Sequence, residues 1–217
     1  DEQLDFVRME RDVCLKSGSL VRWWDLPHSI TRGRPPKVVA PMTVAWHDIK
    51  KKYRLCIDSR YVNLWLKYFP FHFEKLSDLL ASIDVFLEVD GDCWVTLVDL
   101  KSGYHHVPLH PECFTYCCIC IEGEIFAYTV LSFGMAQSVK AFSDVEDSKH
   151  RVMRLLQVAL NFMIDDRAAA QASQAAATWA EKQMIIIGTA LGCYFSWGEE
   201  VFDDQGVLSY SKMEAWG

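Results

Sequence analysis

The sequence has no long hydrophobic run and no leader-like N-terminus. Its longest apolar stretch, MIIIGTALGCYF at residues 184–195, is too short for a membrane-spanning helix, which needs about 20 residues. The first residues, DEQLDFVRMERD, are strongly charged, unlike a secretory signal peptide. We therefore expect an intracellular protein, in the cytoplasm or the nucleus, without a membrane partner.

An excess of positive charge is also missing, because the net charge is −7. Lys and Arg nevertheless outnumber Asp and Glu in residues 1–75, whereas acids dominate the rest. Since affinity for phosphate backbones comes largely from Lys and Arg, any nucleic-acid contact is expected in this basic third. Its densest point is either a solvated hairpin edge or a phosphate-binding group. The residues there are Lys50, Lys51, Lys52, Arg54 and Arg60.

What the sequence has in abundance is core-forming material. With 51% hydrophobic and 13% aromatic residues in 217, disorder is excluded, and one large domain or two joined subdomains are expected. The periodicity predicts a mixed α+β fold in which the Asp-bearing strands lie side by side. We expect helices at 3–18, 73–86, 138–157 and 168–187, and strands at 53–57, 93–100, on both sides of 123, at 158–164, and near 195 and 208.

Eight cysteines are the main compositional oddity, and four of them cluster in the segment FTYCCICIEGEIFAY and just before it. Zinc sites usually pair two Cys-containing turns that are far apart in sequence, whereas this segment predicts two strands around Gly123. We therefore favour buried thiols over a zinc site, and without signs of secretion we expect no disulfides. The clustered residues are Cys113, Cys117, Cys118 and Cys120.

The most informative feature is Asp99, which ends the apolar strand VTLVD, together with the later pair Asp165-Asp166 in NFMIDD. Mg²⁺ prefers hard oxygen ligands, and two such ions can hold the attacking and leaving oxygens of a phosphoryl displacement. The structural alternative is a helix cap at Asp99 and a plain turn at the acid pair. The dipeptide alone is weak evidence, because Asp203-Asp204 repeats it.

Four segments, taken in order, resemble the reverse transcriptases of retrotransposons, most closely those of the tyrosine-recombinase (DIRS-like) elements or related LTR-type enzymes. The segments are KKKYRLCIDSRYVN, VDLKSGYHHVPLHPE, YTVLSFGMAQSVKAF and FMIDD. The first is similar to the pattern K-x-R-x-x-x-D-x-R-x-x-N, and the last stands where the family has Y-x-D-D. The second is the most specific, and the resemblance covers nearly the whole chain.

The resemblance implies a right-hand polymerase, with fingers at 1–75 and 107–137 and a palm at 76–106 and 138–217. The palm would be a ferredoxin-like (RRM-type) antiparallel sheet backed by helices. The implied activity is RNA-directed DNA polymerisation, which adds a dNTP to a primer 3′-hydroxyl on an RNA or DNA template. Thumb, RNase H and integrase or recombinase regions are not recognised, so we expect a part of a larger polyprotein.

The resemblance also implies roles for individual residues. Asp99, Asp165, Asp166 and the Leu100 carbonyl would hold two Mg²⁺ ions, with Mn²⁺ as a substitute. Tyr104 would be the steric gate that excludes a ribonucleotide 2′-hydroxyl. The other implied nucleotide-binding groups are Lys50, Lys51 and Arg54 on the triphosphate, the backbone amides around Ser102 and Gly103, and Phe133 and Gly134 under the base and sugar.

Several positions depart from the family pattern, among them Met163 beside the acid pair and Glu199 near the expected general-acid lysine. Ser132 and Val139 replace two prolines, and Asp144 replaces a basic residue. These departures leave open an alternative, a catalytically inactive remnant that serves as a nucleic-acid- or protein-binding scaffold. A third interpretation, a free-standing RRM-like binder, predicts exposed aromatics on the sheet that carries Asp99.

Overall fold

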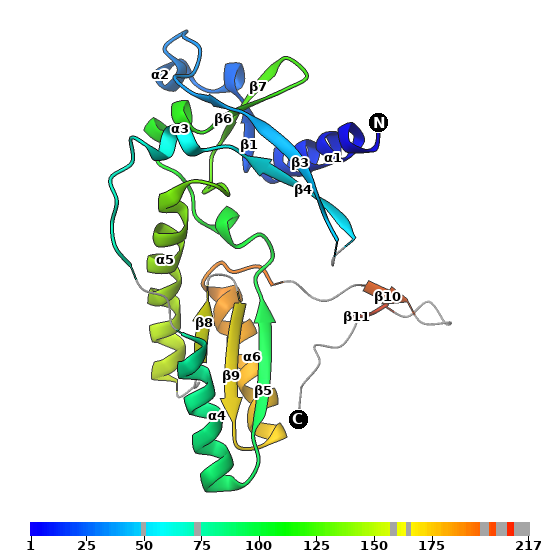
Figure 1. Ribbon diagram of the computed structural model, residues 1–217, viewed down its shortest axis with the longest axis vertical. Helices are drawn as coiled ribbons and strands as arrows, with labels where there is room; N and C mark the ends of the chain where they lie inside the picture. Colours follow the sequence, from blue (N-terminus) through cyan, green and yellow to red (C-terminus); the bar gives the residue numbers. More distant parts are fainter. Residues whose placement is uncertain are drawn as a thin grey trace. The chain divides into compact units, whose positions relative to one another are not determined.

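The computed structural model describes residues 1–48, 51–71, 75–156, 160–163, 166–195, 200–202 and 208–210 (Figure 1). At residues 161, 163, 166, 200–202 and 208–210 it describes the backbone alone. The fold is mixed α+β, as the sequence predicts. None of the helices described is both long enough and apolar enough to span a membrane.

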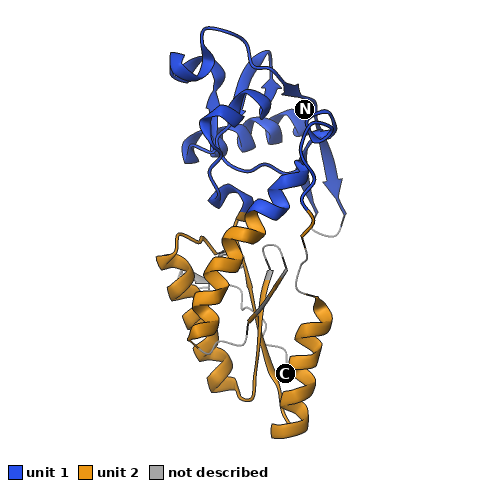
Figure 2. Cartoon of the chain, turned by 90° about the vertical axis from the view of Figure 1, so that its left-hand side faces the viewer, with its two compact units in different colours: residues 1–69, 104–141 blue, residues 70–103, 142–217 orange. Residues whose placement is uncertain are grey.

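The chain forms two compact units, each built from two separate stretches of sequence (Figure 2). Unit 1 comprises residues 1–69 and 104–141, and unit 2 comprises residues 70–103 and 142–217. The 3-10 turn η2 (Gly103–His106) and the long helix α5 (Ala136–Leu155) each contain a boundary between the units.

Unit 1 contains a four-stranded sheet in the order β1-β7-β6-β2 and a separate hairpin of β3 and β4. Along β4, Tyr53, Leu55 and Ile57 are half-buried and their neighbours are exposed, which confirms the predicted alternation. Helix α1 ends at Gly18, whose φ of 75° suits glycine, and packs Val7 into the main core cluster. The elements are α1 (Glu2–Ser17), β1 (Leu20–Arg22), η1 (Trp23–Asp25), α2 (His28–Thr31), β2 (Val39–Ala40), β3 (Met42–His47), β4 (Lys52–Ile57), α3 (Arg60–Asn63), η3 (Pro111–Tyr116), β6 (Cys118–Ile121) and β7 (Glu124–Tyr128).

Unit 2 is built on a three-stranded antiparallel sheet in the order β5-β9-β8. Helix α6 packs against β5 and β9, and the Thr96 hydroxyl donates a hydrogen bond to the Ala177 carbonyl on that helix (3.3 Å). His150 of α5 contacts Phe162 of β8. Helices α5 and α6 therefore both pack on the face of the sheet that carries Thr96 and Phe162. The remaining elements are α4 (Leu76–Asp90), β5 (Trp94–Asp99), β8 (Leu160–Met163), β9 (Asp166–Gln171), α6 (Gln174–Ala190), β10 (Glu200–Phe202) and β11 (Leu208–Tyr210).

The prediction of a helix over 168–187 is wrong at its start. Residues 168–171 belong to strand β9, and α6 begins only at Gln174, after the N-cap Ser173. Ala169 and Ala170 are fully buried in the middle strand, where they pair with Thr96 and Val95 of β5. The intrinsic helix preference of alanine is a few tenths of a kcal/mol per residue, roughly, and tertiary pairing overrides it.

The cysteine cluster is only partly buried. Burial raises the pKa of Cys117 and of Cys118 to about 12, which keeps both as neutral thiols. Cys113 and Cys120 are exposed, so the expectation of buried thiols is wrong for these two. Cys120 lies between Ile119 and Ile121 of β6, which are both buried on the opposite face of the strand, and Cys113 lies outside the sheet in η3.

Candidate functional site

Two of the predicted acid positions face each other across neighbouring strands of unit 2. Asp99 ends β5, Asp166 begins β9, and their Cα atoms are direct partners in the antiparallel ladder. Directly opposed residues in such a ladder share one face of the sheet, with Cβ atoms about 5 Å apart. Asp165 and the side chain of Asp166 lie outside the described residues. The backbone register alone therefore brings two of the three acid positions together.

The opposite face of the same strands is filled by the core. Thr96 and Val98 alternate with Asp99 and are buried under the helices. Among the described residues of β5 and β9, the positions on the Asp99 face are occupied by valine, leucine, alanine and aspartate. The exposed aromatics that a free-standing RRM-like binder needs are absent from those positions.

The chain turns sharply directly after Asp99. Leu100 is buried and forms a bridge with Phe195, beside a hydrogen bond from the Lys101 N–H to the Tyr194 carbonyl (2.9 Å). Ser102 has a φ of 52°, a left-handed conformation that few non-glycine residues adopt. Left-handed residues next to right-handed ones let successive N–H groups converge, which is the arrangement expected of an anion-binding turn.

In unit 1, Tyr104, the predicted steric gate, contacts Phe133, which is predicted to lie under the base and sugar. The rings of Tyr104 and Phe133 meet edge to face with centroids 4.7 Å apart. Tyr104 is only 7% exposed, whereas Phe133 is 54% exposed. Gly134 follows with a φ of 92°, and a Cβ at this position would lie 2.7 Å from the Ile57 carbonyl oxygen. Glycine is therefore required there on both conformational and steric grounds.

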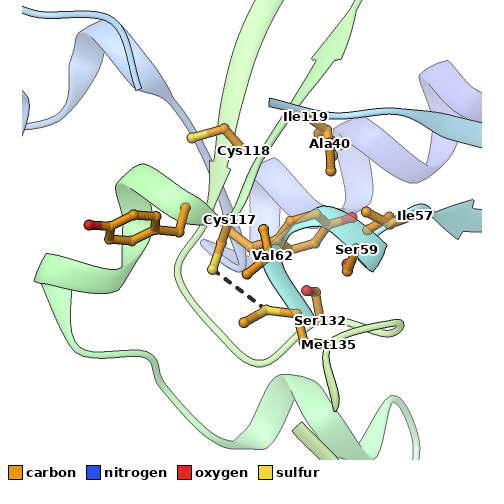
Figure 3. A pocket seen from close by; sticks show the side chains of 11 residues that line it. Ala40, Ile57, Ser59, Val62, Cys117, Cys118, Ile119, Ser132 and Met135 are labelled. Atoms are coloured by element: carbon orange, nitrogen blue, oxygen red, sulfur yellow. Dashed lines mark hydrogen bonds between the residues drawn. The ribbon is translucent and has the colours of Figure 1, made fainter. Parts of the chain in front are cut away.

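Asn63, a residue without a predicted role, holds the loop around Gly134 in place. Its side-chain amide donates to the Gly134 carbonyl (2.9 Å), and its side-chain oxygen accepts from the Ala136 N–H (2.8 Å). Asn63 is the last residue of the segment KKKYRLCIDSRYVN, so the pattern itself was a signal that could have found it. A small cavity lies behind the loop, with Ser59, Val62 and Met135 among its lining residues, and Cys117 points toward Met135 (Sγ–Sδ 3.6 Å; Figure 3).

The predicted triphosphate-binding residues lie on the β3–β4 hairpin of unit 1. Lys51 and Arg54 are exposed, and Lys50 lies outside the described residues. Arg54 and Ile57 are three residues apart on β4, so their Cα atoms are separated by roughly 10 Å along the strand. Arg60 is tied to Asp58 by two hydrogen bonds (2.8 and 2.6 Å), which hold the pKa of that carboxyl at about 2. Arg60 therefore has a partner within its own segment.

The donor chemistry of the acid positions fits divalent cations. Carboxylates are the hard oxygen ligands that Mg²⁺ and Mn²⁺ take, and the backbone positions of Asp99 and Asp166 are direct partners in the ladder. A backbone carbonyl next to Asp99, at Leu100, is a ligand of the same class. The residues present therefore fit the metal ions that the sequence implies.

Comparison with known proteins adds structural neighbours, although no protein-family model matches the sequence. The foamy viral protease-reverse transcriptase in complex with an RNA/DNA hybrid superimposes with a TM-score of 0.71 at 15% identity, over 90% of this chain and 23% of that chain. The CSH mutant of the prototype foamy virus enzyme gives 0.67 at 19% identity, over 88% and 23%. The dRH form with double-stranded DNA gives 0.64 at 15%, over 84% and 28%. The chain has a reverse transcriptase-like fold.

The chain spans about a quarter of the length of the viral chains it matches. At these identities the likeness concerns the fold. It supports the reverse transcriptase-like fold that the sequence resemblance implies.

Proposed function

We propose that the chain comprises the fingers and palm of a retroelement reverse transcriptase of the DIRS-like type, with unit 1 as fingers and unit 2 as palm. The observation that carries this proposal is the β5–β9 ladder, in which Asp99 is the direct partner of Asp166 within a reverse transcriptase-like fold. The neighbouring structures are of protease-reverse transcriptases, one with an RNA/DNA hybrid and one with double-stranded DNA. We propose corresponding partners here: a template, a primer and a dNTP, within a larger polyprotein.

Asp99, Asp165, Asp166 and the Leu100 carbonyl would hold two Mg²⁺ or Mn²⁺ ions. When bound, these ions supply charge neutralisation at the triphosphate and activation of the primer 3′-hydroxyl. Arg54 with Lys50 or Lys51 would bind the triphosphate from the fingers, because a guanidinium can donate to two phosphate oxygens at once. The amides at Ser102 and Gly103 would donate to the same phosphates.

The sugar and base would lie against the Tyr104–Phe133–Gly134 group. Phe133 presents an open ring surface, and Tyr104 supports that ring from the edge, so the two together define how closely a sugar can approach. Gly134 lets the chain pass against the Ile57 carbonyl, and Asn63 fixes the loop through two hydrogen bonds. A rigid loop at this position is what a steric gate requires, since a movable one would yield to a 2′-hydroxyl.

A surface for the template is suggested by exposed rings on α3 and the segment after it. Exposed aromatic rings beside cations suit stacking with unpaired bases, which contributes about 1–3 kcal/mol per base. The ring centroids of Tyr61 and Trp65 are 6.4 Å apart, and the Lys67 ammonium lies 5.2 Å from the Phe69 ring centroid. The exposed large apolar residues of segment 60–69 are Tyr61, Leu64, Trp65, Tyr68 and Phe69.

Primer extension on an RNA template with Mg²⁺ or Mn²⁺ tests the activity. We expect extension by the wild-type chain and a loss of roughly 100-fold or more in Asp99→Asn and Asp166→Asn, because each variant removes an anionic ligand of the metal ions that would stabilise the charge of the transition state. Asp84 is an exposed acid on α4 of the same unit. Asp84→Asn is therefore the matched control and should retain activity. Folded wild-type protein that extends no primer, or equal extension by all four proteins, would overturn the enzyme proposal.

Binding of single-stranded RNA tests the template surface separately. Trp65→Ala should weaken binding by roughly 5- to 150-fold, the equivalent of one lost stacking contact. Trp24→Ala removes another exposed tryptophan, from η1, and serves as the control (Trp24 is 60% exposed and Trp65 76%). Equal affinities of these two variants would contradict a stacking role for Trp65.

A further inference from the structure

The residue after the acid pair is a buried arginine. Arg167 alternates with Asp166 along β9, so it lies on the opposite face of the sheet, under α5 and α6. Its side chain is 1% exposed, and its guanidinium pairs with Glu146 of α5, which is fully buried. A buried ion pair contributes little to stability by itself, because desolvation offsets the attraction, and apolar replacements are often as stable. Its presence here calls for another explanation.

The guanidinium connects several segments of unit 2. Arg167 Nη2 lies 3.3 Å from Cys193 Sγ, and the guanidinium carbon lies 5.4 Å from the Phe195 ring centroid. Lys149 completes the group, with its ammonium 2.6 Å from Glu146 Oε1 and 3.3 Å from Cys193 Sγ. The group therefore joins β9, α5 and the segment that follows α6.

That last segment returns directly to the other acid. Phe195 bridges Leu100, the residue after Asp99, and the Lys101 N–H donates to the Tyr194 carbonyl next to it. Arg167 thus contacts the strand partner of Leu100 and is itself covalently joined to Asp166. Through the Phe195 ring and through the backbone of β9, the guanidinium is therefore connected to the residues next to both acid positions.

We propose that Arg167 and Glu146 are positioning residues, which fix the start of β9 relative to the end of β5 and so set the spacing of the metal-binding acids. This inference rests on the proposed function, because it concerns the same site. Residues that orient metal ligands without touching the metal typically change metal affinity by about 10- to 100-fold when replaced.

Mn²⁺ affinity, measured by electron paramagnetic resonance of the free ion on the full chain, tests the proposal alongside thermal unfolding. The double variant Glu146→Leu/Arg167→Met removes the ion pair and keeps apolar volume, but it also leaves the Lys149 ammonium without its carboxylate, so thermal unfolding is used to establish that the variant is folded. We expect it to bind Mn²⁺ about 10- to 100-fold more weakly. Arg167→Lys keeps the charge but not the planar fork, and should weaken binding in the same direction.

Arg154→Met is the matched control, because Arg154 of α5 binds the Leu160 carbonyl at the opposite end of the β8–β9 hairpin (3.0 Å). It should lower the unfolding temperature and leave Mn²⁺ affinity unchanged. Wild-type affinity in folded Arg167→Lys or in the folded double variant would overturn the positioning role alone. If the wild-type protein binds no Mn²⁺, or if the Asp99→Asn variant binds Mn²⁺ as tightly as wild type, the proposed function is overturned. This inference is then overturned with it.

Discussion

His150 gives the sharpest test of the interior of unit 2. It is 0% exposed on α5, its ring lies 3.9 Å from that of Phe162, and neither ring nitrogen has a hydrogen-bond partner among the described residues. Burial, followed by the charges of Arg167, Arg154 and Lys149, lowers the pKa of His150 to about 2. Glu146 lies 4.0 Å from the imidazole Nε2 and favours protonation, but one anion is outweighed by three cations and desolvation.

The direction of the pH effect follows from the two states. An unfolded histidine has a pKa of about 6.5, so between pH 6.5 and 2 the unfolded chain takes up a proton that the native chain refuses. This contribution to stability is therefore complete above pH 6.5 and is lost as the pH falls. At pH 5 the difference of 1.5 pH units corresponds to about 2 kcal/mol of unfolding free energy, at 1.36 kcal/mol per unit.

Urea unfolding of wild type and His150→Leu at pH 7.5 and pH 5 measures this quantity. We expect wild type to lose about 2 kcal/mol more than the variant over that interval, because leucine cannot take up a proton. His110→Leu removes an exposed histidine and should follow the wild-type profile. Parallel pH profiles for wild type and His150→Leu would refute the argument that His150 is held neutral.

Substitutions of three glycines give further tests of packing. Gly134→Ala should destabilise by about 2–4 kcal/mol in urea unfolding, since it combines a left-handed φ with a Cβ 2.7 Å from the Ile57 carbonyl oxygen. Gly123→Ala, with a similar φ but open space, should lose only about 1 kcal/mol, and equal losses would contradict the steric part. Gly188→Ala places a Cβ 2.3 Å from the Phe195 ring. It should lower the unfolding temperature, with a loss of about 1–3 kcal/mol of unfolding free energy. Adding Phe195→Leu should restore part of that loss, and a double variant less stable than Gly188→Ala would refute the clash.

Local sequence patterns predicted many of the elements correctly. The alternation in β4, the C-cap at Gly18 and the apolar run of β5 each depend on residues that are neighbours in the chain. Local preference failed at residues 168–171, where alanines that favour a helix form the central strand instead. The pairing that overrides them comes from β5, about seventy residues earlier, and no local window contains it.

For the candidate site, too, the residues could be predicted from the sequence and their arrangement could not. From the sequence alone we could name the candidate residues for the chemistry, which are Asp99, the Asp165-Asp166 pair, Ser102 and the Phe133-Gly134 step. Their arrangement was decided by tertiary structure, because the ladder that opposes Asp99 to Asp166, the Asn63 bonds to the 134–136 loop and the Arg167–Glu146 pair join residues far apart in the chain. Such contacts form only when burial and backbone pairing bring distant segments together, and chemical identity alone does not encode them.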